Sequence, residues 1–291
     1  MSDRLTLQMP QNACDCHTHV VGPRSRYPMA EGRHYTPGPA SHGALLAHLA
    51  LHGLRRVVIV QPSVYGTDNR CMLDSLDRLA DRARGIAVLD EGADAATLSS
   101  LHRRGIRGLR MNVESADLRD AEAPQAALTR WAERIERLGW HLQVYAALDI
   151  IAALADRLAR LAVPVVLDHF AMLPMDIDPD DRRAKALLEL LRSGNAYIKL
   201  SAPYRLAPSG TPDKQRVGRW ASTFMHIAPG RVLWGSDWPH TSREAGKPAL
   251  EVSRCRILPA TDLDESVADW LAAPALKQRV LVDNPACLYR F

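Results

Sequence analysis

Four side chains in this sequence could together activate a water molecule for attack on a carbonyl carbon. His17 and His19 stand two residues apart, His169 directly follows an aspartate, and Asp237 lies in the segment Trp-Gly-Ser-Asp-Trp-Pro-His. A carboxylate can accept a proton from water, and an imidazole can donate a hydrogen bond, accept one or bind a metal ion. Each residue alone has a structural explanation, such as a helix cap for Asp237. A catalytic role requires that the fold bring them together.

The two histidines of the first motif belong to an apolar segment, Ala13–Val20, that we predict to be a strand. Because side chains alternate across a strand, His17 and His19 share one face, with Asp15 below them. The opposite face carries Cys14, Cys16 and Thr18. These thiols are therefore expected to pack beneath outer helices, which disfavours the alternative of a zinc site made of cysteine and histidine.

Short apolar segments alternate with longer amphipathic ones along the chain. The apolar segments are Ala13–Val20, Arg56–Gln61, Gly85–Leu89, Gly108–Met111, His141–Tyr145, Pro164–Asp168, Ala196–Leu200 and Val232–Gly235. The helical patterns are Ser41–Leu51, Asn69–Arg82, Ala95–Arg103, Gln125–Leu138, Asp149–Leu161, Arg182–Leu191, Arg216–Ile227, Leu263–Ala273 and Ala275–Val282. Segments that are apolar throughout are typical of parallel strands buried on both faces.

Eight strands that alternate with helices predict an α/β fold, a (β/α)8 TIM barrel forming a single domain over residues 1–291. A doubly wound open sheet is the alternative, but no glycine-rich phosphate loop follows an early strand. Two long loops, Gly22–Ala40 and Pro174–Asp181, follow the first and sixth strands and are expected to help form a substrate pocket.

The composition excludes several classes of protein. Lys and Arg number 37 and Asp and Glu 33, a net charge of +4, and the basic residues form no long run, so no nucleic-acid partner is expected. Five scattered cysteines do not resemble a disulfide framework. No segment has the roughly 18–20 apolar residues that cross a bilayer, and residues 1–10 lack a signal-peptide pattern. We expect a cytoplasmic protein, without a membrane partner, that is a monomer or homodimer.

The active site of a TIM barrel lies at the carboxyl ends of its strands. A barrel would therefore bring together His17 and His19 from the first strand, His169 from the sixth and Asp237 from the eighth. The same ends, and the loops that follow them, carry further polar residues that could contact a substrate: Tyr35, Ser63, Tyr65, Arg110, Tyr145, Lys199 and Arg205.

These motifs resemble those of the amidohydrolase superfamily, of the amidohydrolase 2 type, and more closely those of the 2-pyrone-4,6-dicarboxylate lactonase group. The resemblance rests on His-Thr-His at 17–19, Asp-His at 168–169 and the segment 234–240, and it covers essentially the whole chain. Further similar stretches are Asp15–Gly22, His34–Pro37, Gln61–Asn69, Gly105–Asn112, Trp140–Tyr145, Lys199–Arg205 and Asp283–Tyr289. It implies a lactonase that hydrolyses a small carboxylated lactone in the catabolism of aromatic compounds or sugar acids.

The resemblance also bears on metal binding. Metal-dependent members of the superfamily add a histidine from the fifth strand, and binuclear members a lysine or glutamate from the fourth. Here the fifth strand ends at Tyr145 and the fourth carries Arg110, which stays protonated and is a poor ligand. We therefore expect no metal cofactor. The alternative is a zinc ion held by the four residues His17, His19, His169 and Asp237.

In the expected mechanism Asp237 is the general base for the attacking water. The three histidines donate hydrogen bonds to the lactone carbonyl, as preorganised donors do in an oxyanion hole. Arg110 and Arg205 bind the substrate carboxylate, because a guanidinium can hold a carboxylate with two hydrogen bonds. Tyr145, Tyr35, Ser63, Tyr65 and Lys199 are further expected contacts.

Two departures from the lactonase pattern affect the expected substrate. Enzymes of the group that take the doubly carboxylated pyrone carry extra arginines, whereas here Met172 follows His169 by three residues and the segment 113–117 is acidic. A muconolactone or sugar-acid lactone is therefore favoured over the pyrone. A lactone isomerase at the same site, a zinc-dependent hydrolase or decarboxylase, and a non-catalytic binding barrel are the alternatives.

Overall fold

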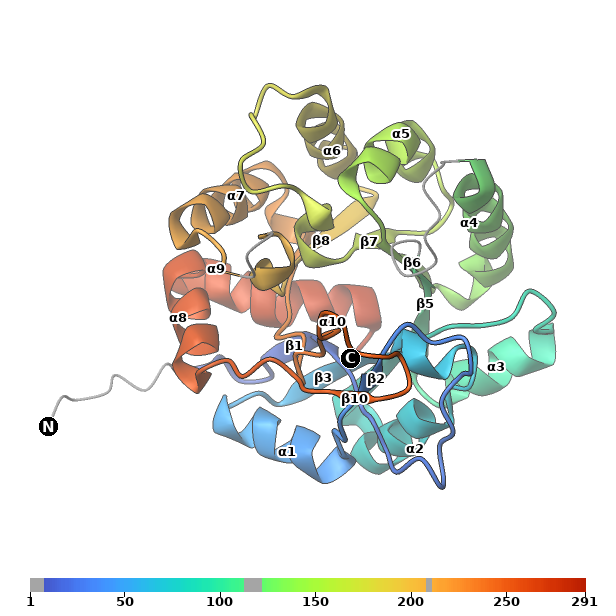
Figure 1. Cartoon of the computed structure of the whole chain (residues 1–291). Helices are drawn as coiled ribbons and strands as arrows, with labels where there is room; N and C mark the ends of the chain where they lie inside the picture. The colour runs from blue at the N-terminus through green and yellow to red at the C-terminus, as the bar shows by residue number, and fades with distance from the viewer. Residues whose placement is uncertain (1–7, 113–121, 208–210) are drawn as a thin grey trace, which may run out of the picture.

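A computed structural model describes residues 8–112, 122–207 and 211–291 of the chain. Eight parallel strands follow one another in the order β1-β3-β4-β5-β6-β7-β8-β9, with helices between them around the outside (Figure 1). The strands are β1 (Cys14–Thr18), β3 (Arg56–Val60), β4 (Ala83–Ala87), β5 (Ile106–Asn112), β6 (His141–Tyr145), β7 (Val165–Leu167), β8 (Ala196–Leu200) and β9 (Val232–Trp234). The predicted (β/α)8 barrel is confirmed.

The outer layer is helical. The described part of the chain contains the helices α1 (His42–Leu51), α2 (Arg70–Leu79), α3 (Ala95–Arg103), α4 (Glu122–Ile135), α5 (Leu148–Ala159), α6 (Arg182–Arg192), α7 (Lys214–Ile227), α8 (Ala260–Trp270), α9 (Pro274–Gln278) and α10 (Asn284–Tyr289), of which α10 lies at the lower end of the barrel. The predicted segment 275–282 ends early as α9, and a π-helical turn over residues 279–283 leads into α10. Pro285 lies in the first turn of α10, where the missing amide proton costs no hydrogen bond.

Backbone hydrogen bonds join the first and last strands and so close the barrel. The amide of Asp237 donates to the carbonyl of His17 at 2.9 Å, and the amide of His19 donates to the carbonyl of Trp238 at 2.8 Å. Closure of the barrel therefore places the histidine pair and the aspartate side by side.

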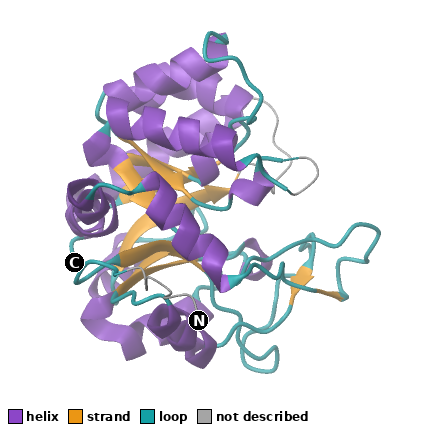
Figure 2. Cartoon of the chain, turned by 90° about the vertical axis from the view of Figure 1, so that its left-hand side faces the viewer, coloured by secondary structure: helices purple, strands orange, loops and turns teal. Residues whose placement is uncertain are grey.

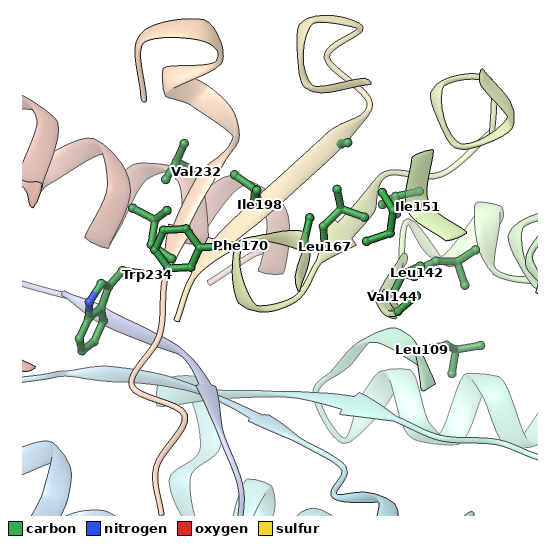
Figure 3. Close-up of a cluster of buried hydrophobic side chains, with 14 of the residues drawn as sticks. Leu109, Leu142, Val144, Ile151, Leu167, Phe170, Ile198, Val232 and Trp234 are labelled. Atoms are coloured by element: carbon green, nitrogen blue, oxygen red, sulfur yellow. The ribbon is translucent and has the colours of Figure 1, made fainter. Parts of the chain in front are cut away.

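Apolar side chains form two layers, one on each side of the strands. The outer layer, between strands and helices, contains Leu109, Leu142, Leu167, Ile198 and Trp234 among others (Figure 3). A smaller cluster fills the barrel interior and contains Cys14, Cys16, Val58, Val60, Ile86, Val166, Tyr197, Leu233, Leu288 and Tyr289. The last two residues of that cluster belong to α10, so the C-terminal helix closes the lower end of the barrel.

The predicted alternation along the first strand is wrong, because β1 contains a β-bulge. Asp15 pairs with Val57 and Thr18 with Ile59, so three steps on β1 match two on β3. The extra residue lets Cys16 and His17 both face the barrel interior. The thiols therefore lie inside the barrel rather than beneath the outer helices, and Asp15 faces α1, where Oδ2 lies 3.2 Å from Nε2 of His48.

Two loops at the carboxyl ends of the strands pair with each other. β2 (Thr36–Pro37), within the predicted loop after the first strand, pairs with β10 (Val252–Ser253), within the loop after β9. This paired flap and the C-terminus lie on opposite sides of the molecule (Figure 2). Among the described residues, no helix is long and apolar enough to cross a membrane.

Candidate active site

Three imidazole rings converge on one oxygen of a buried carboxylate. Oδ1 of Asp237 lies 3.6, 3.5 and 4.0 Å from the Nε2 atoms of His17, His19 and His169. All four side chains are almost completely buried. Within the described residues, no hydrogen bond reaches this Oδ1 atom. The structure thus brings the four predicted residues together around an oxygen that is free to bind a water molecule.

The segments that carry His169 and Asp237 adopt an unusual backbone conformation. The four residues of the short helical segment η4 (His169–Met172) have φ between 48° and 57°, and Asp237 has φ 61°. Non-glycine residues in this left-handed region cost on the order of 1–3 kcal/mol each, so packing around them must hold them in place. Such conformations are concentrated at functional sites.

The second oxygen of Asp237 is fully engaged. Oδ2 accepts hydrogen bonds from the Tyr204 hydroxyl at 2.6 Å and from Nε and Nη2 of Arg205 at 3.0 and 2.8 Å. Burial raises the pKa of Asp237, but the Arg205 guanidinium and the surrounding imidazoles outweigh it and hold the pKa well below its usual value. Asp237 is therefore ionised at neutral pH, with one oxygen fixed and the other available.

A second buried carboxylate, Asp168, lies beneath the histidines. Its Oδ2 accepts from Nε2 of Gln143 at 3.0 Å and lies 3.4 Å from Arg110, and its Oδ1 lies 3.3 Å from both Nζ of Lys199 and Nδ1 of His17. Burial raises the pKa of Asp168, but Lys199 and His17 reverse the shift and hold it well below the usual range. Burial likewise lowers the pKa of Lys199, which Asp168 opposes.

Two histidines of the cluster, His17 and His169, are neutral. Burial lowers the pKa of His17 to about 3, against the opposing attraction of Asp168. Burial also lowers the pKa of His169 well below its usual value. These rings therefore act at neutral pH through single N–H donors and lone pairs, rather than as cations.

Backbone and hydroxyl contacts orient the other two rings. Nδ1 of His19 lies 2.8 Å from the carbonyl oxygen of Val60, which only accepts, so Nδ1 carries the proton and Nε2 presents a lone pair to Asp237. Nδ1 of His169 lies 2.8 Å from the hydroxyl of Ser201, which can donate or accept. With a single ring proton, at Nδ1, His19 can accept a hydrogen bond from a bound water through Nε2 but cannot donate one through Nε2 to a carbonyl.

The comparison with protein families agrees with this architecture. The family model described as Amidohydrolase matches residues 14–291. The chain belongs to the amidohydrolase family. The resemblance of its His-Thr-His, Asp-His and Gly-Ser-Asp motifs to this family is thereby confirmed.

Characterised relatives of this amidohydrolase act on lactones. A 2-pyrone-4,6-dicarboxylate hydrolase of Comamonas testosteroni is 33% identical over 97% of this chain and 91% of its own. A 4-sulfomuconolactone hydrolase of Hydrogenophaga intermedia is 30% identical over 98% of this chain and 91% of its own. A D-galactarolactone isomerase of Agrobacterium fabrum is 25% identical, over 97% and 92% of the two chains.

A solved structure has the same fold over nearly the whole chain. The probable 2-pyrone-4,6-dicarboxylic acid hydrolase of Acinetobacter baumannii, solved with citric acid bound, superposes with a TM-score of 0.81 at 27% identity. The match covers 96% of this chain and 100% of that one.

The residues predicted to contact substrate fall into two groups in this amidohydrolase. Arg110 lies over the ring of Tyr145, 5.4 Å from its centre, and that ring packs edge-on against His169. The hydroxyl of Tyr35 donates a hydrogen bond to Thr241. Burial raises the pKa of Tyr35, while the Arg205 guanidinium lowers it and the Asp237 carboxylate raises it. These residues border the cluster.

The other predicted contacts lie away from the histidines or beneath them. The Tyr65 hydroxyl accepts from the amide of Gly22, in the loop after β1. Within the described residues, Ser63 makes no hydrogen bond to the cluster. Lys199 has no exposed surface and lies below His17, where it pairs with Asp168.

Sequence reasoning missed Gln143, Ser201 and Tyr204. Gln143 carried a signal, because it is two residues from both His141 and Tyr145 and therefore shares their face of β6. Ser201 and Tyr204 follow β8 in irregular segments, for which no periodicity predicts the direction of a side chain. Their partners, His169 and Asp237, are known only from the fold.

The cluster has atoms close enough to hold a metal ion. Two groups, His17 with His19 and Asp237, and His17 with Asp168 and His169, each have ligand atoms within 4.8 Å of one another. Distance alone therefore permits a divalent ion. Binding also requires that both histidines of the first group present unprotonated Nε2 atoms, and the Nδ1 proton of His19 leaves its Nε2 bare.

A cavity of about 760 Å³ lies outside the barrel wall, between α7 and α8. Tyr204 and Ser236 border it, but none of the three histidines nor Asp237 does. It is therefore separate from the cluster of histidines around Asp237.

Proposed function

We propose that this amidohydrolase hydrolyses a small carboxylated lactone, with Asp237 as the general base. The observation that carries the proposal is the free Oδ1 of Asp237, buried and ionised, with three imidazole rings directed at it. The relatives include two lactone hydrolases, which supports the same reaction class here.

The reaction proceeds in two steps. A water held by Oδ1 of Asp237 and the lone pair of His19 attacks the lactone carbonyl, and its proton passes to Asp237 as the new C–O bond forms. The ring C–O bond then breaks, and the proton moves from Asp237 to the leaving alkoxide oxygen. The low pKa of Asp237 makes it a weak base in the first step but a strong acid in the second.

Hydrogen-bond donors stabilise the negative charge that develops on the carbonyl oxygen. His17 and His169 direct their Nε2 atoms into the same space, and each preorganised donor contributes on the order of 3 kcal/mol. His19 has the opposite role, because its proton is held at Nδ1 by the carbonyl of Val60. All three rings were expected to donate hydrogen bonds to the carbonyl oxygen, and we now propose this role for His17 and His169 alone.

A carboxylate on the substrate is proposed to bind Arg110 and Arg205. In the described part of the chain, the hydrogen bonds of Arg110 to Gln61 and Asp168 are long, at 3.4 Å, so its guanidinium retains donor capacity. The bound citric acid in the Acinetobacter relative supports a preference for carboxylated ligands. The acidic segment 113–117, which disfavours the doubly carboxylated pyrone as substrate, lies outside the described residues.

We further propose that the enzyme works without a metal. Three cationic side chains, Arg110, Lys199 and Arg205, already face two carboxylates, Asp168 and Asp237, in the buried cluster. A divalent ion would add two positive charges to a site that has an excess of one, at high electrostatic cost in a medium of low dielectric constant.

The direct test is acid release from a panel of pyrone, muconolactone and sugar-acid lactones, followed with a pH indicator. The protein is treated with chelator and compared with zinc-supplemented protein and with Asp237→Asn. Turnover that survives chelation and falls by roughly 10²–10⁴-fold in the variant supports the proposal. Turnover only with zinc would overturn the proposal that the enzyme works without a metal. No acid release from any lactone would overturn the proposal that it is a hydrolase.

A lactone isomerase is the second candidate, because one relative is a D-galactarolactone isomerase. The same base would then move the acyl group between hydroxyl oxygens of one substrate, or remove a proton from carbon. Product analysis by NMR distinguishes the two activities, since isomerisation consumes no water and releases no acid.

A further inference from the structure

The position of the proton on His17 follows from the groups beneath it. Gln143 lies between Asp168 and Lys199, and one end of its amide is 3.0 Å from the Asp168 carboxylate. That end must be the NH₂ group, because an amide oxygen there would face another acceptor. The amide oxygen therefore accepts from Nζ of Lys199 at 2.7 Å.

Three acceptor atoms lie near the three protons of Lys199, two of them with hydrogen-bond geometry. Nζ donates to Gln143, lies 3.3 Å from Oδ1 of Asp168 and lies 3.3 Å from Nδ1 of His17. An ammonium group only donates, so Nδ1 of His17 accepts the third proton. A neutral ring that accepts at Nδ1 carries its own proton at Nε2.

The competing arrangement has weaker geometry. Nδ1 of His17 could instead donate to Oδ1 of Asp168, also at 3.3 Å, but within the described residues this Oδ1 has no hydrogen bond of acceptable geometry. The contact between Lys199 and Nδ1 does have hydrogen-bond geometry. The alignment therefore favours Lys199 as the partner of His17.

We propose that Lys199 is a positioning residue that fixes His17 with its proton on Nε2, opposite to His19. The carbonyl-donating role of His17 rests on the proposed function, whereas the tautomer does not. His17 then presents an N–H group to the lactone oxygen, while His19 presents a lone pair to the water. A protonated Nε2 cannot bind a metal ion, so the residues beneath the cluster disfavour a zinc ion held by His17, His19 and Asp237.

The test is nitrogen NMR of the protein labelled with ¹⁵N in its histidine rings, with the His17 signals assigned from His17→Asn. The account predicts that the wild-type ring is protonated at Nε2 and bare at Nδ1. In Lys199→Met the proton should move to Nδ1, where it can donate to Asp168. The matched control is Lys185→Met, which removes an exposed lysine of α6 that pairs with Asp180. This variant should leave the spectrum unchanged.

Zinc titration gives a second readout. Lys199→Met leaves both His17 and His19 with bare Nε2 atoms, so its zinc affinity should rise at least about tenfold over wild type, and its kcat should fall about 10²–10³-fold with little change in KM. A wild-type His17 protonated at Nδ1 overturns the proposal, and so does an unchanged tautomer in the variant. If Lys199→Met does not fold, the wild-type spectrum alone decides which nitrogen of His17 carries the proton. If the spectra are as expected but no lactone is turned over, the proposed function is refuted and the assignment of the His17 tautomer still holds.

Discussion

The two oxygens of Asp237 have different tasks. Oδ2 is bonded to Tyr204 and Arg205, while Oδ1 faces the imidazoles without a hydrogen bond in the described part of the chain. Fixing one oxygen orients the other, so the proposed general base would be positioned before substrate arrives, an arrangement that makes such catalysis efficient. Residue types and motifs predicted Asp237 and the three histidines.

Residue types could not predict how the protons are distributed. The contrast between His17 and His19 depends on Lys199 and on the carbonyl of Val60, which are distant in sequence. No spacing rule places a lysine beneath one histidine and a backbone carbonyl beside the other. The mechanism at this level follows only from the packed barrel.

Arg110→Met tests the proposed carboxylate clamp. Hydrogen bonds to charged groups contribute about 1.5–3 kcal/mol, so KM for a carboxylated lactone should rise roughly 10–100-fold while kcat changes little. Steady-state kinetics should be compared with those for the methyl ester of the same lactone, which should be affected less. An equal loss for both substrates would mean that Arg110 acts through Asp168 rather than on the substrate.

At the scale of elements, the bulge in β1 decides which side chains face the barrel interior. Strict alternation placed Asp15 on the histidine face and the thiols outside, and both placements were wrong. A bulge inserts one residue without any reliable signature in sequence. Here Asp15 stabilises it by accepting from the amides of His17 and Ser236 at 3.1 and 2.9 Å.

Asp15→Ala should therefore destabilise the protein far more than Ser236→Ala. Losing the buried carboxylate leaves several donors unpaired and should lower the free energy of unfolding by about 3–5 kcal/mol. Ser236→Ala removes one hydrogen bond to Asp15, at 2.5 Å, and should cost about 1 kcal/mol. Urea unfolding measures both. Similar small losses for the two variants would show that Asp15 does not hold β1 against the loop after β9.

The reactivity of the thiols reports on their burial. Cys14, Cys16 and Cys71 are buried, Cys255 is partly exposed and Cys287 is exposed. In the native protein a thiol reagent should modify Cys287 quickly and Cys255 more slowly, because only accessible thiolates react. All five cysteines of the chain should react after unfolding. A third reacting thiol in the native protein would contradict the burial of Cys14, Cys16 and Cys71.

For the whole molecule, the sequence predicted the barrel and the strand order but not how its two ends are closed. Eight apolar segments alternating with helices leave few other solutions. The pairing of β2 with β10 involves two residues from each of two long loops, too few for a periodic signal. The helix α10 begins at Asn284-Pro285, and the proline resembles a helix stop although it is tolerated in a first turn.

Buried neutral histidines should make the fold sensitive to mild acid. Burial lowers the pKa of His141, inside the barrel, to about 3, against about 6.5 in an unfolded chain. Between these values the unfolded state binds more protons, so the free energy of unfolding falls as pH decreases from about 6.5. His141→Phe should make this fall shallower between pH 7 and 5 in urea titrations, whereas a change at exposed His34 should not. An unchanged slope of unfolding free energy against pH in His141→Phe would contradict the assignment of this acid sensitivity to His141.

The most direct test of the account is a single turnover of the preferred lactone in ¹⁸O-water with chelator-treated protein. Water activated by Asp237 must deliver one labelled oxygen to the newly formed carboxylate, and Asp237→Asn must form this labelled product far more slowly. Mass spectrometry that finds the label in the ring-opened acid without added metal would support the central claim. A converted product without ¹⁸O would contradict hydrolysis and identify the enzyme as an isomerase.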